Sequence, residues 1–223
     1  MRRTNMIITI DGPAGAGKST AARMLARRLS FEFLDTGAMY RAVALSALRA
    51  GIELRDEPAL ARFVRGVSLE MPAGLVLLDG ADVSVAIRSQ AVSDAASLVA
   101  TSPAVREHLV HLQRIIAADR NIVCEGRDQG TVVFPDATCK FFLIADAEER
   151  ARRRHRDLAV RGEAIDPATL METLRRRDRQ DATRPVGPMK AADDAIEIDS
   201  TGLSSEQVVE RMEAVVLSRR SPA

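Results

Sequence analysis

A glycine-rich stretch near the amino terminus holds the residues best suited to bind a phosphate chain. The run Gly12-Pro13-Ala14-Gly15-Ala16-Gly17-Lys18-Ser19-Thr20 follows the spacing G-x-x-x-x-G-K-[ST]. Glycines adopt positive φ and carry no Cβ, so successive backbone N–H groups can curl around a polyphosphate. Lys18 supplies a positive charge for the β- and γ-phosphates, and the Ser19 hydroxyl suits Mg²⁺. We therefore predict that this run binds a nucleoside triphosphate together with Mg²⁺.

The segments on either side of this loop support the prediction. Residues 6–11 are rich in Ile and Thr, as expected of a strand, and the pattern Ala22, Leu25, Ala26 and Leu29 has the period of a helix. The positive end of that helix would face the bound anion. Short Gly/Ala loops also connect strands to helices without binding anything, but the order strand, loop, helix favours a phosphate site.

Two later segments place polar residues directly after apolar runs. Asp35, Thr36 and Arg41 follow the run 31–34, and Glu125 to Thr131, including Arg127 and Asp128, follow the run 121–124. Strands that alternate with helices predict a parallel sheet, whose ligands lie beyond the carboxyl ends of the strands. An internal Arg127–Asp128 ion pair that only shapes a loop is the alternative interpretation.

The composition is that of an ordinary soluble globular protein. The 223 residues are 46% apolar and 28% charged, with a formal net charge of +1 that gives no overall reason to expect nucleic acid. No apolar run approaches the length of a membrane span, and the amino terminus shows no targeting signal. Cys124 and Cys139 fit no metal spacing and indicate reduced thiols, so we expect a cytoplasmic protein. His108 and His111 have no third ligand nearby, which favours a surface or packing role.

The remaining segments predict three further features. Short runs at 67–70, 75–78 and 82–85, separated by turn residues, indicate a small antiparallel meander. Ser102-Pro103 opens a helix that continues to about residue 118. Two arginine-rich helices, beginning at 146–149 and at Asp166-Pro167, indicate a mobile hairpin able to close on bound phosphates. A last strand at 195–198 and a helix with the capping box Ser204-Ser205-Glu206-Gln207 complete the chain.

Six motifs spread over the chain together resemble the bacterial cytidylate kinase family. They are DGPAGAGKST from 11, DTGAMYR at 35–41, VSDAAS at 92–97, PAVRE at 103–107, GRDQGTVVFPDA at 126–137 and RRDRQDATRPVGPM at 176–189. The resemblance runs from about residue 6 to about 217. It implies an α/β P-loop fold, three layers α/β/α with a parallel five-stranded sheet, a small antiparallel meander insert and a helical lid. It also implies that the γ-phosphoryl group of ATP is transferred to CMP or dCMP.

The same resemblance implies boundaries and roles for individual residues. A single domain, 1–223, would have its core at 1–51, 98–149 and 190–223, a nucleotide-monophosphate-binding insert at 52–97 and a lid at 150–189. The implied catalytic residues are Lys18, Arg127, Asp128 and Arg184. The implied acceptor-binding residues are Ser97, Arg106 and Asp128 for cytosine, either directly or by orienting one another. Arg177 and Asp181 are implied for the sugar, and Thr36, Arg41, Arg127 and Arg184 for the phosphate. Arginines within 150–156 are implied to reach the ATP side.

Chemistry supports Asp128 as the residue that discriminates between bases. Cytosine carries an amino donor where uracil carries a carbonyl, so a carboxylate can accept from the first and repel the second. The reaction needs no protein nucleophile, because the acceptor phosphate attacks, and the protein has to position two anions and neutralise charge.

Two departures from the family pattern and several alternatives accompany this interpretation. Ser19 stands where many nucleotide kinases have Gly, which strengthens the Mg²⁺ prediction, and Gln129 takes a position that is more often apolar. Kinases for UMP, AMP or shikimate are the nearest alternatives. A GTP-dependent switch would need a guanine-reading N-K-x-D motif, which is absent, and a nucleic-acid-binding ATPase would need more aromatic residues. We expect a monomer whose partners are ATP and CMP or dCMP, with no nucleic acid and no membrane.

Overall fold

The main body of the protein is a parallel five-stranded sheet with helices on both faces. The computed structural model describes residues 5–160, 162 and 166–220, so residues 161 and 163–165 of the predicted lid lie outside the described residues. The strand order is β2-β6-β1-β7-β8. The strands are β1 (Ile7–Asp11), β2 (Glu32–Asp35), β6 (Ile122–Glu125), β7 (Cys139–Ile144) and β8 (Ile196–Asp199). The predicted parallel five-stranded sheet is confirmed.

The strand β1 occupies the centre of the sheet and delivers the glycine loop. It pairs in parallel with β6 on one side, where Ile10 lies opposite Glu125, and with β7 on the other, where Asp11 lies opposite Phe142. The chain crosses from β1 to β2 on one side and later from β6 to β7 on the other, so ligand-binding loops meet at the carboxyl ends of β1 and β6.

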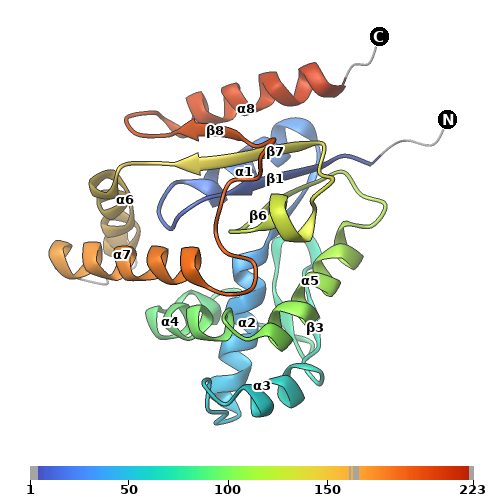
Figure 1. Ribbon diagram of the computed structural model, residues 1–223, viewed down its shortest axis with the longest axis vertical. Coiled ribbons are helices and arrows are strands. Elements are labelled where there is room, and N and C mark those ends of the chain that lie inside the picture. The colour runs from blue at the N-terminus through green and yellow to red at the C-terminus, as the bar shows by residue number, and fades with distance from the viewer. Residues whose placement is uncertain (1–4, 161, 163–165, 221–223) are drawn as a thin grey trace.

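Helices cover the two faces of the sheet (Figure 1). One face carries α1 (Lys18–Leu29) and α8 (Ser205–Arg220), while the other carries α2 (Thr36–Arg49), α4 (Gln90–Val99) and α5 (Pro103–Ala117). The side chains of β1 and β6 alternate between the two cores: Ile8, Ile10 and Val123 pack with α1 and α8, whereas Ile122 and Cys124 pack on the opposite face. A parallel sheet that is buried on both faces requires this apolar composition.

The insert contains the predicted meander, most of α4 and one further helix, and the sequence analysis predicted neither of these two helices. Its strands are β3 (Leu69–Glu70), β4 (Leu77–Leu78) and β5 (Ala81–Asp82), and its other helices are α3 (Glu57–Val64) and the 3₁₀ turns Pro72–Gly74 and Ala86–Arg88. The strands are antiparallel, as predicted, but shorter. The Asp82 carboxylate accepts hydrogen bonds from the backbone N–H and the hydroxyl of Ser84, and this local turn ends β5 before residue 83.

Two helices form the predicted arginine-rich hairpin. They are α6 (Ala147–Val160) and α7 (Pro167–Thr183), which lie beside each other at the edge of the molecule (Figure 1). The Asp166 side chain caps α7 by accepting from the backbone N–H of Thr169. At α8, Ser204 and Gln207 exchange the two hydrogen bonds of a capping box, at 2.9 and 3.2 Å. Both predicted helix starts are confirmed.

Candidate active site

The glycine loop has the backbone conformation that its sequence predicts. Gly12, Gly15 and Gly17 have φ of +138°, +78° and +91°, values that other residues rarely adopt. A Cβ at Gly12 would lie 2.1 Å from the carbonyl oxygen of Leu143 on β7, so a side chain cannot be accommodated there. Strand β7 therefore forms the back wall of the loop.

Lys18 is buried at the base of the loop in an electropositive environment. Its Nζ donates to the Pro13 carbonyl at 2.7 Å, and the residue is 5% exposed. Burial, followed by the repulsion of Arg127, lowers the pKa of Lys18 from 10.5 to about 7, with Glu125 and Asp11 acting in the opposite direction. A bound polyphosphate would supply the missing negative charge.

Ser19 and Glu125 come together from positions 106 residues apart. The Ser19 hydroxyl donates to Glu125 Oε1 at 2.5 Å. Burial, and next the charge of Asp35, raise the pKa of Glu125 above its usual value. Ser19 and Glu125 lie where β6 ends beside the first turn of α1. Every polar heavy atom of their side chains is an oxygen.

One cavity contains most of the predicted acceptor-binding side chains. Six cationic and three acidic side chains line it, so its formal charge is positive. The predicted residues that line it are Ala14, Gly15, Lys18, Ser19, Thr36, Arg41, Ser97, Arg127, Asp128, Arg177, Asp181 and Arg184. Two adjoining cavities share Ser19 with it, and Ala16, Gly17 and Thr20 line one of them. The loop and the arginines therefore face one cleft.

A buried ion pair joins the loop after β6 to the helix α7. Arg127 Nε donates to Asp181 Oδ2 at 2.7 Å. Although burial acts in the opposite direction, Arg127 and Arg177 hold the pKa of Asp181 below its usual value. Burial and the repulsion of Arg127 lower the pKa of Arg177 to about 10, and its buried Nε has no hydrogen-bond partner among the described residues. Arg177 thus has an unused donor where anionic oxygens would fit.

Asp128 lines the cavity and lies between two arginines. Arg106 forms an ion pair with Asp128 Oδ2, and Arg184 Nη2 lies 3.2 Å from Oδ1. Arg106 also donates to the Tyr40 hydroxyl at 3.2 Å, is 2% exposed and does not line the cavity. Its position matches the orienting role that the resemblance allowed, and contact with the cavity comes from Asp128.

A carboxylate that the sequence analysis did not select holds this segment in place. Asp11, at the end of β1, accepts hydrogen bonds from the backbone N–H groups of Gln129 at 2.9 Å and Gly130 at 2.8 Å. These residues begin a π-helical turn, Gln129–Val133, directly after Asp128. Burial raises the pKa of Asp11 to about 6. The unusual Gln129 is 1% exposed, and its Oε1 has no hydrogen-bond partner among the described residues.

The other predicted acceptor residues lie on the walls. Arg41 pairs with Asp35 Oδ2 at 3.1 Å, and the Thr36 hydroxyl donates to the Glu125 carbonyl at 2.6 Å. The Ser97 hydroxyl donates weakly to the Ser93 carbonyl at 3.4 Å within α4. These three side chains come from α2 and α4, and α4 is in contact with α7 of the hairpin.

The lid arginines divide into distinct groups. Arg153, Arg154 and Arg156 line the cavity beside the glycine loop, whereas Arg152 is exposed and pairs with Glu149. Arg150 is buried against the loop backbone. The sequence analysis left open which of these arginines reach the ATP side. It named Glu125 at the end of an apolar strand but assigned it no role.

Comparisons with known proteins agree with this geometry. The sequence model of a family described as "Cytidylate kinase" matches residues 8–217. A relative named "Cytidylate kinase" from Pelotomaculum thermopropionicum is 51% identical over 218 residues, which cover 96% of each chain. Another of that name, from Geobacillus kaustophilus, is 50% identical over 216 residues, covering 95% of this chain and 96% of the relative.

Solved structures share the fold at low sequence identity. A shikimate kinase from Acinetobacter baumannii aligns with a TM-score of 0.50 and 16% identity, covering 98% of this chain and 97% of that one. An uncharacterized protein from Eubacterium ventriosum aligns with a TM-score of 0.56 and 12% identity, covering 96% and 99%. Within the part of the chain that the structure describes, no helix has the length and apolar character needed to cross a membrane.

Proposed function

The chain belongs to the cytidylate kinase family, and on that premise we propose that it transfers the γ-phosphoryl group of ATP to CMP or dCMP, giving ADP and CDP or dCDP. The observation that carries the proposal is one cavity lined both by Lys18 of the glycine loop and by Asp128 together with Arg184. A donor phosphate held at Lys18 and an acceptor base held at Asp128 would then lie in the same cleft. The structural likeness to shikimate kinase supports the fold alone.

We assign the acceptor base to the part of the cavity that Asp128 lines. Cytosine presents an amino donor on the edge where uracil presents a carbonyl acceptor. Arg106 and Arg184 each pair with one oxygen of the Asp128 carboxylate and fix its orientation, and carboxylate oxygens accept hydrogen bonds. Ser97 on α4 lines the same cavity and offers a hydroxyl to the base.

The sugar and phosphate of the acceptor suit the charged side chains that line the cavity between Lys18 and Asp128 in the proposed binding mode. Asp181 and Arg177 suit the sugar hydroxyls, while Arg41, Arg127 and Arg184 suit the phosphate, with Thr36 nearby. A guanidinium group often binds phosphate through two parallel N–H···O hydrogen bonds. The carboxylates of Asp35, Asp181 and Asp128 form ion pairs with these arginines.

The donor set at Ser19 and Glu125 fits Mg²⁺. This ion binds oxygen ligands, keeps several waters and takes one or two carboxylates together with substrate phosphates. The Ser19 hydroxyl and the Glu125 carboxylate, 2.5 Å apart at the base of the loop, meet that description. When bound with ATP, the ion would neutralise charge on the phosphates.

The protein's part in the reaction is positioning and charge neutralisation. The loop amides and Lys18 hold the donor phosphates, and the arginines bring the acceptor phosphate into line with the γ-phosphorus. Fixed cations in a cleft shielded from water stabilise the charge on the transferring group. The hairpin α6–α7 already contacts α4 through Gln180, which donates to the Ser97 carbonyl at 2.9 Å. A closed hairpin keeps water from the γ-phosphate.

The proposal extends to the location, the oligomeric state and the partners of the protein. We propose a cytoplasmic monomer that binds neither nucleic acid nor membrane. Small nucleotide substrates inside a cell and the two buried free thiols, Cys124 and Cys139, support the location.

The experiment that tests the function compares acceptors in a coupled assay. The wild-type protein is expected to use CMP and dCMP well and UMP, AMP and shikimate poorly. Asp128→Asn replaces one acceptor oxygen by a donor, so kcat/KM for CMP should fall by roughly 10- to 150-fold, while KM for ATP changes little. Glu32→Gln, at an exposed ion pair with Arg120, is the charge-matched control and should leave every rate unchanged.

The controls separate a lost contact from a lost fold. Asp128 is a buried partner of two arginines, so its removal also destabilises the protein, and thermal melting and ATP binding are measured alongside. Equal wild-type rates on CMP and UMP would refute the role of Asp128. Shikimate as the preferred acceptor would refute the proposed function as a whole.

A further inference from the structure

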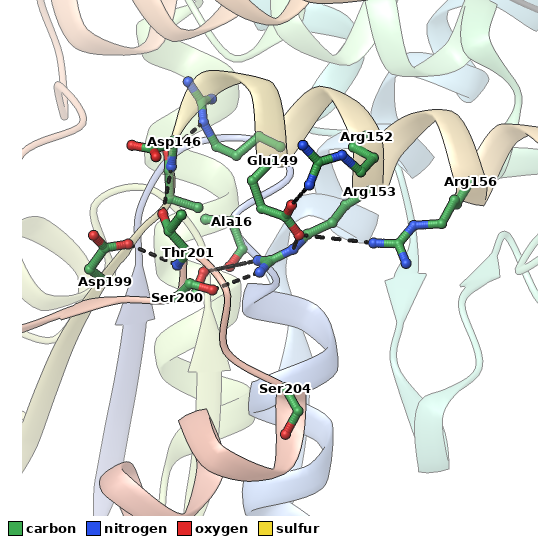
Figure 2. Close-up of polar contacts among 12 residues, drawn as sticks. Ala16, Asp146, Glu149, Arg152, Arg153, Arg156, Asp199, Ser200, Thr201 and Ser204 are labelled. Carbon is green, nitrogen blue, oxygen red and sulfur yellow. Dashed lines mark hydrogen bonds and ion pairs between the residues drawn. The ribbon is translucent and has the colours of Figure 1, made fainter.

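Two arginines on the first turns of α6 hold the outer side of the glycine loop. Arg150 Nη1 donates to the carbonyl oxygen of Ala14 at 3.1 Å, and Arg153 Nη1 approaches that of Ala16 at 3.4 Å. The two arginines are three residues apart and therefore lie on the same face of the helix. Figure 2 shows Arg153 lying between Glu149 and the segment that contains Ser200, with Ala16 adjacent.

Because the peptide bond is planar, contacts that fix the direction of a loop carbonyl also fix the direction of the next N–H group. In a planar trans peptide the C=O of one residue and the N–H of the next point in opposite directions. The carbonyls of Ala14 and Ala16 point toward α6, so the N–H groups of Gly15 and Gly17 point away from it. Inward-pointing amides are what an anion-binding loop requires.

The position of Arg153 is fixed from several sides. Its Nε donates to Glu149 Oε1 at 2.8 Å, and its Nη groups donate to the Ser200 hydroxyl at 2.9 Å and the Ser200 carbonyl at 2.7 Å (Figure 2). The Ser200 hydroxyl in turn lies 3.1 Å from the Ala16 carbonyl. Ser200 is 1% exposed, with its hydroxyl occupied by these backbone and guanidinium contacts, and it contributes to the wall of the cavity beside the glycine loop.

The helix α7 reinforces the contact at Ala14. Asp178 accepts from the backbone N–H of Ala14 at 3.3 Å and pairs with Arg150. Arg150 also donates from Nε to the Ala145 carbonyl at 3.1 Å, which anchors it to the end of β7. The hairpin is thus joined to the loop backbone by charged side chains from both of its helices.

We propose that Arg150 and Arg153 are positioning residues that orient the loop N–H groups toward the donor phosphates. Ser200 holds Arg153 in place by accepting hydrogen bonds from its guanidinium group. The two arginines act on the protein backbone, in contrast to a direct contact with phosphate or adenine. The inference rests on the proposed function in one respect, that the donor phosphates bind in this loop.

The test measures binding of inorganic tripolyphosphate, which has the phosphates of ATP and no base. Its affinity is obtained by calorimetry with Mg²⁺ present, and KM values for ATP and CMP are measured in parallel. Arg153→Met and Ser200→Ala should each weaken tripolyphosphate binding and raise KM for ATP, roughly 5- to 20-fold for the loss of hydrogen bonds from a charged group and less for the hydroxyl. KM for CMP should stay unchanged.

Matched variants sharpen the comparison. Arg152→Met removes a charge from the next position on α6, where the side chain is exposed and pairs with Glu149, and should leave both affinities unchanged. Arg153→Lys keeps a donor and should recover part of the lost affinity. The double variant Arg153→Met with Ser200→Ala should be less impaired than the product of the two single effects, because both act on the Ala16 carbonyl.

Thermal melting first shows which variants are folded. In those variants, three outcomes would overturn the inference. Loss of tripolyphosphate binding in Arg153→Met, with Ser200→Ala unaffected, would indicate direct contact with phosphate. Weaker ATP binding with unchanged tripolyphosphate binding would indicate contact with adenine. No change in either variant would show that the loop needs no such support. A wild-type protein that failed to bind MgATP would instead count against the proposed function.

Discussion

The low pKa of Lys18 predicts that nucleotide binding is accompanied by proton uptake. Burial and the neighbouring Arg127 lower the pKa of this amine to about 7 in the free protein. Donor phosphates placed next to the amine favour its charged form and raise its pKa again. Above pH 7 the Lys18 amine is mostly neutral before the nucleotide binds, so the amine must take up a proton on binding.

The size of the effect follows from the pKa. With a value of about 7, the neutral fraction of Lys18 is about 0.1 at pH 6, about 0.5 at pH 7 and about 0.9 at pH 8. Binding at pH 8 should therefore take up about 0.9 of a proton. As pH rises above 7, affinity should fall by up to about tenfold per pH unit, equivalent to about 1.4 kcal/mol.

Calorimetry in buffers of different ionisation enthalpy measures this uptake directly. MgADP at pH 8 is the ligand, because its phosphates are then fully ionised and contribute no protons. Lys18→Met is the control: it keeps the length of the side chain and cannot titrate. The difference between the two proteins isolates Lys18 from Asp11 and Glu125, whose pKa values are also raised.

Two results would refute this reasoning. The first is an observed binding enthalpy at pH 8 that does not depend on the buffer. The second is an equal proton uptake by Lys18→Met, which would assign the proton to another group. Either result would mean that Lys18 keeps its charge in the free protein despite its burial.

Two further predictions concern the loop and the proposed metal site. Glu125→Gln removes the carboxylate beside Ser19, so the Mg²⁺ concentration needed for half-maximal rate should rise at least tenfold while KM for CMP stays unchanged; an unchanged Mg²⁺ requirement would contradict the metal role. Gly12→Ala places a Cβ 2.1 Å from the Leu143 carbonyl at a positive φ, so it should lower the free energy of unfolding by more than about 2 kcal/mol in urea titration; a fully stable variant would show that β7 can move away.

Local signals in the sequence were sufficient for many elements. The glycine spacing predicted the phosphate loop, and its glycines have the positive φ values that the spacing requires. Ser102 and Asp166 were correctly assigned as helix caps, since a cap and the amide that it accepts from lie three residues apart. The helix α3 was missed although Asp56 caps it and its buried residues Leu60 and Val64 lie four residues apart, because its eight residues span only about two turns.

The arrangement of the site depended on contacts that no local pattern contains. Glu125 lies beside Ser19 because β6 pairs with β1, and strand order is a property of the whole sheet. Arg106 was expected near the base, and its place behind Asp128 follows from how α5 packs on the sheet.

The sequence by itself determined which groups are present: a glycine loop with its lysine, an excess of arginine and the elements that carry them. Only the tertiary structure decided which arginines line the cavity that contains Asp128 and which, like Arg150 and Arg153, hold the loop backbone. All guanidinium groups are alike in charge and reach, so their roles are set by the nearest acceptor. That acceptor, such as the Ala14 carbonyl 136 residues away from Arg150, is brought close only when the sheet and hairpin have assembled.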